Sequence, residues 1–140
     1  MEIKILLDAL TDRSPETVYF LDTKSGKVYS LKAGELKQPQ VQEFIKIRQK
    51  EPERFAQVPK IPSAEVFKDM EAFLAGLMDV KFKEKLAKLI GGGGGYRDFL
   101  GALEGKLEKE QWYNFRTARN KARLKNWLKT IGLGEKFGSF

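Results

Sequence analysis

The sequence predicts an α+β fold, in which an N-terminal β-hairpin or small antiparallel sheet is followed by four or five helices on a single core. Two short runs rich in β-branched and aromatic residues flank a glycine-bearing loop near residue 26, which is typical of a hairpin. Apolar residues then recur at helical spacing through most of the chain. The length of 140 residues suits one domain, so we expect residues 1–140 to fold as a single unit.

The N-terminal third holds the expected strands. Residues 2–10 come first and predict a short helix, because isoleucine and leucine recur there at i, i+3, i+4 and i+7. Residues 17–21 and 27–31 predict the two strands of the hairpin, with Gly26 as the left-handed residue of its loop. Residues 55–58 are the candidate third strand, and the proline that follows them favours an edge position.

Helices are expected in the rest of the chain. Their apolar stripes predict five segments, at residues 40–50, 64–77, 80–90, 96–103 and 108–131. Asp79 stands directly before the third of these and is expected to cap it. Gly132 follows the last and is expected to end it in the left-handed conformation.

The composition excludes several kinds of chemistry. The chain has no cysteine and no histidine, which removes thiol nucleophiles, histidine bases, and zinc or haem sites built on either residue. Asp22 and Asp98 are the acids whose positions suggest acid–base catalysis, but neither belongs to a carboxylate pair with the spacing of a glycosidase or metal site. We therefore expect no catalytic residue, no metal and no cofactor, and we do not expect an enzyme.

The positive charge is concentrated at the C-terminal end. The net charge is +7, and residues 106–140 hold nine lysines and arginines against three acids. No window approaches the length of a membrane span, and the N-terminus lacks the basic start and long apolar run of a secretory signal. We expect a cytoplasmic protein with no membrane partner.

The last predicted helix carries the candidate binding residues. On a helical wheel Arg116, Arg119 and Arg123 form one stripe, and a second stripe is formed by Lys121, Lys125 and Lys129. The arginines lie between apolar strips that include Trp112, on which a guanidinium could stack. One interpretation is a basic groove with aromatic platforms for RNA. The other is a helix packed on two neighbours, with the arginines paired to acids such as Glu104 or Glu71.

Five consecutive glycines, residues 91–95, precede the helix predicted at residues 96–103. Free amides of Gly93, Gly94 and Gly95, with Arg97 nearby, would suit an anion at a helix N-terminus. The alternative is a hinge between two helices. The segment lacks the Lys–Ser/Thr pair of a nucleotide-binding loop and does not follow a strand, which favours the hinge.

Several short motifs resemble those of a bacterial family, Uncharacterised Protein Family 0158. In order along residues 17–133 they are Tyr19-Phe20-Leu21-Asp22, Gly26-Lys27-Val28, Ile61-Pro62, Met70-Glu71-Ala72-Phe73, Gly94-Gly95-Tyr96-Arg97-Asp98-Phe99, Trp112-Tyr113-Asn114-Phe115, and Trp127-Leu128 with Gly132. The chain departs from the family pattern in its glycine run and at Asp98. The resemblance implies a helical protein with an N-terminal hairpin, and it implies no activity.

These observations lead to one expected function and two alternatives. We expect a non-catalytic binding module that holds an acidic partner on its basic C-terminal helix, with RNA as the first candidate. A protein–protein adaptor without a nucleic-acid role is the alternative. A weaker alternative is an enzyme or binder for a phosphorylated small molecule at the glycine run. The sequence does not give the oligomeric state.

Overall fold

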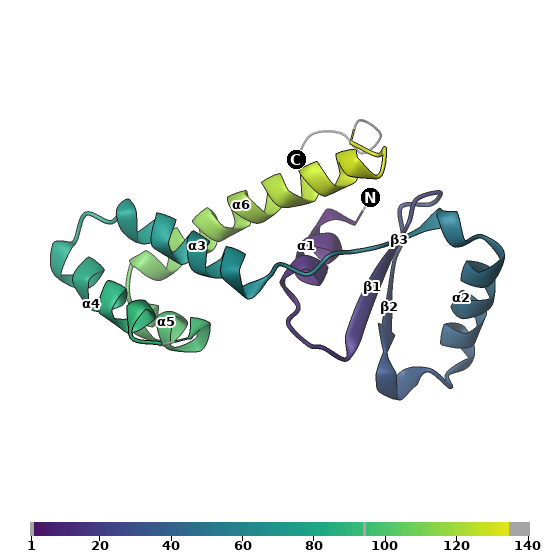
Figure 1. Cartoon of the computed structure of the whole chain (residues 1–140), viewed down its shortest axis with the longest axis horizontal. Helices are drawn as coiled ribbons and strands as arrows, with labels where there is room; N and C mark the ends of the chain where they lie inside the picture. Colours follow the sequence, from purple (N-terminus) through teal and green to yellow (C-terminus); the bar gives the residue numbers. More distant parts are fainter. Residues whose placement is uncertain (1, 94, 135–140) are drawn as a thin grey trace. The chain divides into compact units, whose positions relative to one another are not determined.

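The computed structural model describes residues 2–93 and 95–134, and it confirms the α+β class (Figure 1). Its chain forms two compact units. The sheet unit comprises the residues up to Lys60 and those from Lys121 onward, and the helical unit comprises Ile61–Asn120. The last helix, α6 (Glu108–Thr130), contributes to both units. The single domain expected from the length stays a prediction.

The sheet unit is built on three antiparallel strands, which are β1 (Thr17–Asp22), β2 (Val28–Lys32) and β3 (Phe55–Gln57). Their order is β2-β1-β3, so the predicted hairpin and the third strand at an edge are both confirmed. Phe20 in the central strand lies opposite Tyr29 and Gln57. Gly26 has φ 79° in the hairpin loop, the left-handed conformation expected for it.

Two helices of the sheet unit lie on opposite sides of the sheet, α1 (Ile3–Thr11) and α2 (Pro39–Lys50) (Figure 1). Phe44 of α2 stacks on Tyr29 with 4.8 Å between ring centroids and meets Phe55 edge-on at 5.0 Å. On the other face, the Tyr19 hydroxyl donates to the carboxylate of Asp12, just after α1, at 2.5 Å. Two short 3-10 turns, η1 (Ala33–Glu35) and η2 (Pro52–Arg54), flank α2 in the chain.

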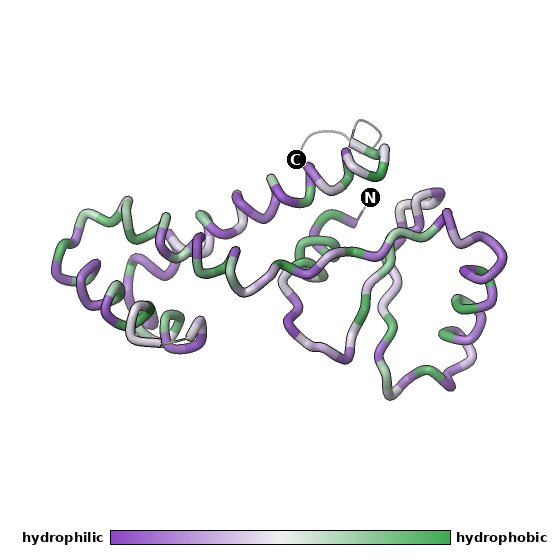
Figure 2. Tube along the Cα trace, in the orientation of Figure 1, coloured by the Kyte–Doolittle hydropathy of each residue, from purple (hydrophilic) through white to green (hydrophobic). Residues whose placement is uncertain are grey.

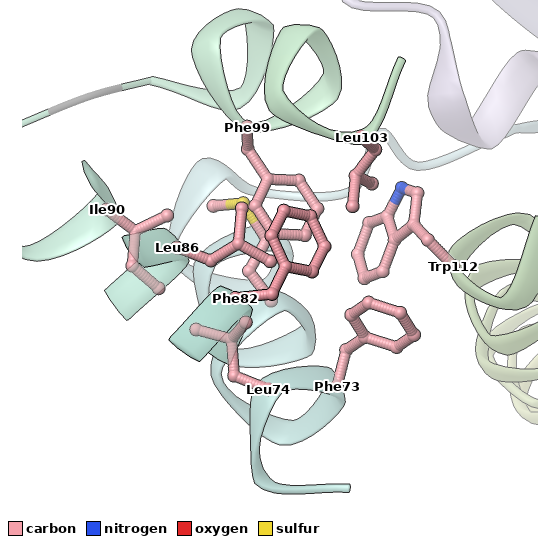
Figure 3. Packing of buried hydrophobic residues seen from close by; sticks show 9 residues of the cluster. Phe73, Leu74, Phe82, Leu86, Ile90, Phe99, Leu103 and Trp112 are labelled. Atoms are coloured by element: carbon pink, nitrogen blue, oxygen red, sulfur yellow. The ribbon is translucent and has the colours of Figure 1, made fainter. Parts of the chain in front are cut away.

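The helical unit consists of α3 (Ser63–Ala75), α4 (Val80–Gly91), α5 (Tyr96–Leu103) and the first part of α6. Their apolar stripes meet in one cluster of large side chains (Figure 3). Trp112 of α6 points into this cluster and meets the rings of Phe99 and Phe73 edge-on, at centroid distances of 5.0 and 5.3 Å. Asp79 caps α4 as expected, accepting from the amide of Phe82 at 3.1 Å.

The helix boundaries lie close to those predicted. The α3 helix ends at Ala75 rather than at residue 77, because the chain turns at Gly76. Gly132 follows α6 with φ 82°, as expected. Apolar and polar residues alternate along the helices at the period that predicted them (Figure 2). None of the helices in the described part of the chain is long and apolar enough to span a membrane.

Candidate nucleic-acid interface

The two basic stripes of α6 have different surroundings. Because α6 is continuous from Glu108 to Thr130, side chains four residues apart share a face, as the wheel predicted. The arginine stripe turns toward groups of the protein itself. The lysine stripe lies on a more exposed side of the helix.

Arg119 pairs with a buried acid. Its Nε donates to Oδ1 of Asp69 on α3 at 2.6 Å, and the Asp69 residue is 2% exposed. The Arg119 guanidinium also lies over the ring of Phe115, with its carbon 5.4 Å from the centroid. The Arg119 side chain is nevertheless 42% exposed. Asp69 therefore fixes one edge of the guanidinium and compensates its charge, while part of the group still meets solvent.

Arg116 forms a hydrogen bond with an aromatic residue of the helical unit. Its Nη1 donates to the hydroxyl of Tyr96, the first residue of α5, at 2.6 Å. The indole Nε1 of Trp112 lies 3.4 Å from the same oxygen. The Nε of Arg116 is buried without a hydrogen-bond partner among the described residues. Arg116 is half-buried and links α6 to α5.

The expected aromatic platform is also part of the core. Trp112 is 2% exposed, because its ring fills the space between Phe73 and Phe99. A base cannot stack on a ring that is covered on this scale, so the role suggested for Trp112 is replaced by a role in packing.

The remaining candidates from the sequence lie apart from one another. Arg123 is half-buried and takes part in an interaction within the protein. Arg97 is exposed in the first turn of α5. Gly93 is exposed with φ 86°, Gly95 is the N-cap of α5, and Gly94 lies outside the described residues. The structure does not gather these residues and the α6 cations into one site within either unit.

The glycine run has a backbone explanation for two of its members. A Cβ on Gly92 would lie 3.0 Å from the carbonyl oxygen of Lys88, and Gly93 adopts a left-handed conformation after the end of α4. Both are features of a helix C-terminus, which agrees with the hinge interpretation. The anion site stays a prediction.

Three lysines of α6 remain available. Lys125 and Lys129 are exposed and Lys121 is half-buried, and all three belong to the sheet unit. Among the described residues, none of the three ammonium groups forms an ion pair, in contrast to Lys109, which lies 2.6 Å from Glu104. Spaced four residues apart, they form a row of uncompensated positive charge, which we call the lysine row.

The sequence analysis missed two ion pairs that position basic side chains, Asp69 with Arg119 and Asp22 with Arg54. It offered Glu104 and Glu71 as partners of the arginines, whereas the structure pairs Arg119 with Asp69. Asp69 was detectable, because it stands among the apolar positions that α3 buries, and a buried acid there requires a cation. The pairing of Asp22 with Arg54 was not detectable from spacing, since 32 positions separate the two residues.

The described residues contain no group of three or more acids that could hold a metal ion. Asp22 is the acid with the most altered pKa: the Arg54 guanidinium holds the pKa of its carboxyl well below the usual range, aided by Ser25 and by backbone amides. A carboxylate stabilised in this way is a poor proton acceptor. The contacts of Asp22 instead suit a structural role, in which this carboxylate connects the hairpin loop to the turn before β3.

The comparison with known proteins gives a family. The sequence profile of an uncharacterised protein family, UPF0158, matches residues 1–137. The chain belongs to this family. The resemblance seen in the hairpin, glycine and tryptophan motifs is therefore confirmed, and it extends beyond residues 17–133 to nearly the whole chain.

Curated relatives of the chain are UPF0158 proteins from Chlamydia species. One from Chlamydia trachomatis serovar D is 25% identical over 126 residues, which are 89% of this chain and 38% of the relative. One from Chlamydia pneumoniae is 25% identical over 131 residues, which are 92% of this chain and 40% of the relative. The chain thus spans about two-fifths of the length of these relatives. No solved structure matches the chain.

Proposed function

We propose that this UPF0158 chain is a non-catalytic cytoplasmic binding module that holds an acidic partner, RNA in the first place, on the lysine row of α6. The observation that carries the proposal is the absence of an ion pair at Lys121, Lys125 and Lys129 within the described part of the chain. Phosphates bind lysines by neutralising charge that the protein has left uncompensated, and this term supplies most sequence-independent affinity.

The geometry shifts the proposal from arginines to lysines. Asp69 compensates the charge of Arg119, and Arg116 donates a hydrogen bond to Tyr96. These two arginines therefore support the fold first, and only the parts of them that reach solvent, such as the exposed part of Arg119, could add to binding. A partner held by lysines alone is bound through charge and with little base selectivity, since ammonium groups lack the planar fork of a guanidinium.

Fluorescence anisotropy with a labelled single-stranded RNA tests the proposal. We expect binding at low salt, with an affinity that falls as salt rises by a log–log slope of about −0.7 per phosphate contact. The triple variant Lys121→Gln, Lys125→Gln, Lys129→Gln should weaken binding at least about tenfold and reduce that slope by about 2.

A matched control is available on α4. Lys81, Lys85 and Lys88 are exposed, share one face of that helix, and form no ion pair among the described residues. They lie in residues 61–105, where seven acids outnumber six lysines and arginines, whereas the lysine row lies in the strongly basic residues 106–140. The glutamine triple variant on α4 removes the same charge and should leave the affinity within about threefold of the unmodified protein. Equal losses in the two triple variants, or no RNA binding by the unmodified protein, would refute the proposal. Binding of an acidic polypeptide but not of RNA would favour the adaptor alternative.

A further inference from the structure

The outer edge of β2 offers backbone groups that no other strand uses. In the sheet β2 pairs with β1 only. The amide of Asp22 donates to the carbonyl of Lys27 at 2.8 Å, and that of Ala33 donates to Glu16 at 3.1 Å. In an antiparallel pair, the backbone N–H and C=O groups of successive residues point alternately toward the neighbouring strand and away from it. The two bonds therefore show that the backbone groups of residues 27, 29, 31 and 33 point toward β1. The backbone groups of Val28, Ser30 and Lys32 therefore point outward.

A side chain confirms this orientation at one end of the strand. The amide of Val28 donates to Oε2 of Glu2 at 3.1 Å, from the side away from β1. Ser30 and Lys32 are exposed, and their outward backbone groups have no hydrogen bond among the described residues. By contrast, the other edge strand, β3, has only three residues and leads into Pro59 within two positions.

We propose that β2 pairs antiparallel with β2 of a second copy of this chain, about a two-fold axis at Ser30. This register places Ser30 opposite Ser30 and Val28 opposite Lys32, and it joins the two sheets into one of six strands. The outward residues 28, 30 and 32 are symmetric about Ser30, so Ser30 of each copy can exchange two backbone hydrogen bonds with Ser30 of the other. The Val28 amide is bonded to Glu2 in the single chain, so it pairs with the Lys32 carbonyl of the second copy only after Glu2 has released it.

The charges at the edge fit a second copy in this register. Glu2 sits at the amide of Val28, and Lys32 of the second copy would lie opposite Val28. Once it is displaced from that amide, the Glu2 carboxylate of one copy would meet the Lys32 ammonium of the other, and each dimer would contain two such contacts. Lys32 forms no ion pair within the described part of its own chain, although, after the hydrogen bond from Tyr19, its charge helps to lower the pKa of Asp12.

The apolar side chains of the edge fit as well. Tyr29 and Leu31 are half-buried and pack against the cluster beneath α2. In the proposed register Tyr29 lies opposite Leu31 of the second copy, so the pairing covers the exposed parts of both. Five residues per strand make a small interface, and we expect a dimer that dissociates on dilution rather than an obligate one.

Sedimentation velocity from micromolar to millimolar concentration tests the pairing. The unmodified chain should shift from monomer to dimer, and Ser30→Pro should remain monomeric. Proline removes the outward donor without breaking a bond to β1, so it is compatible with the folded edge strand. Ser30→Thr keeps the donor and should dimerise as the unmodified chain does. Circular dichroism checks that each variant is folded.

Charge reversal and crosslinking test the register. Lys32→Glu should weaken the dimer by placing two acids together, and the double variant Glu2→Lys, Lys32→Glu should restore it. The chain has no cysteine, so Ser30→Cys introduces one thiol per copy. Paired Cα atoms about 5.5 Å apart suit a disulfide, and mild oxidation should crosslink this variant but not Gln49→Cys on α2.

The results of these experiments decide whether β2 pairs with a second copy. Dimerisation that Ser30→Pro prevents and the double charge reversal restores would establish the pairing. A monomer at every concentration, a Ser30→Pro dimer of unchanged affinity, or crosslinking of Gln49→Cys as efficient as that of Ser30→Cys would each overturn it.

Discussion

The carboxylate of Asp22 grips the guanidinium of Arg54 along one edge, with Nε at 2.9 Å from Oδ1 and Nη2 at 2.8 Å from Oδ2. The Asp22 side chain is buried at the end of β1, and Arg54 precedes β3 directly. The same carboxylate accepts from the amide of Lys24 at 2.9 Å and from the hydroxyl of Ser25 at 2.8 Å. One acid therefore closes the hairpin loop and fastens the third strand beside it.

Replacing Asp22 with Asn should destabilise the protein. The variant keeps the shape but loses the charge-assisted bonds to Arg54, which are worth about 2–3 kcal/mol together. Urea unfolding followed by circular dichroism measures the change. In a double-mutant cycle with Arg54→Met, the two losses should be strongly non-additive, because each variant removes the same contact. Additive losses would show that the pair does not act as a unit.

The same pair makes stability depend on acid pH. The pKa of Asp22 is lowered in the folded state, so its contribution is complete above the unfolded value of about 3.9 and is lost as pH falls toward the folded value. The difference in unfolding free energy between the unmodified protein and Asp22→Asn should be constant near neutral pH and shrink below about pH 4. A difference that is constant down to the acid transition would contradict this account.

An alkaline transition is expected at Tyr19. Its hydrogen bond to the Asp12 carboxylate raises the pKa of Tyr19 to about 12. The contribution of this bond is complete below the unfolded value of about 10 and is lost as pH rises through about 12. Spectrophotometric titration of the four tyrosines should show a late phase that Tyr19→Phe removes and Tyr113→Phe leaves in place. A late phase that survives in Tyr19→Phe would refute the assignment.

The sequence predicted those features that depend on local pattern. The hairpin with its left-handed Gly26, the edge position of β3, the cap at Asp79 and the helix end at Gly132 follow from residue type and spacing, and the structure confirms them. These features depend on backbone conformations that few residue types favour, so single positions are informative. The family resemblance also depended on such short motifs.

The partners of the charged residues could not be predicted in the same way. A helical wheel places Arg116 and Arg119 on one stripe, but it does not show which residue on another helix meets them. Tyr96 and Asp69 meet them across 20 and 50 positions of sequence. Such contacts depend on how helices pack, and a sequence alone shows only that a buried acid such as Asp69 needs a partner.

Replacing Arg119 should lower the free energy of unfolding, because this side chain pairs with Asp69. Arg119→Glu would place a second carboxylate beside buried Asp69, so we expect a loss of about 2 kcal/mol in unfolding free energy, against about 1 kcal/mol for Arg119→Lys. Lys125→Glu on the open side of the same helix should change stability by less than about 0.5 kcal/mol. Equal effects of Arg119→Glu and Lys125→Glu would mean that the Asp69 contact contributes little.

Alanine substitutions at Gly91 and Gly93, two positions apart in the glycine run, should change stability in opposite directions. Gly93 has φ 86°, so Gly93→Ala forces an unfavourable left-handed conformation and should cost about 1 kcal/mol. Gly91 is the last residue of α4 and has open space around its Cβ position, so Gly91→Ala should stabilise the protein by about 0.5–1 kcal/mol. Thermal unfolding measures both. Equal effects at the two positions would show that the run is uniformly flexible, whereas opposite signs would show that α4 ends at a defined turn.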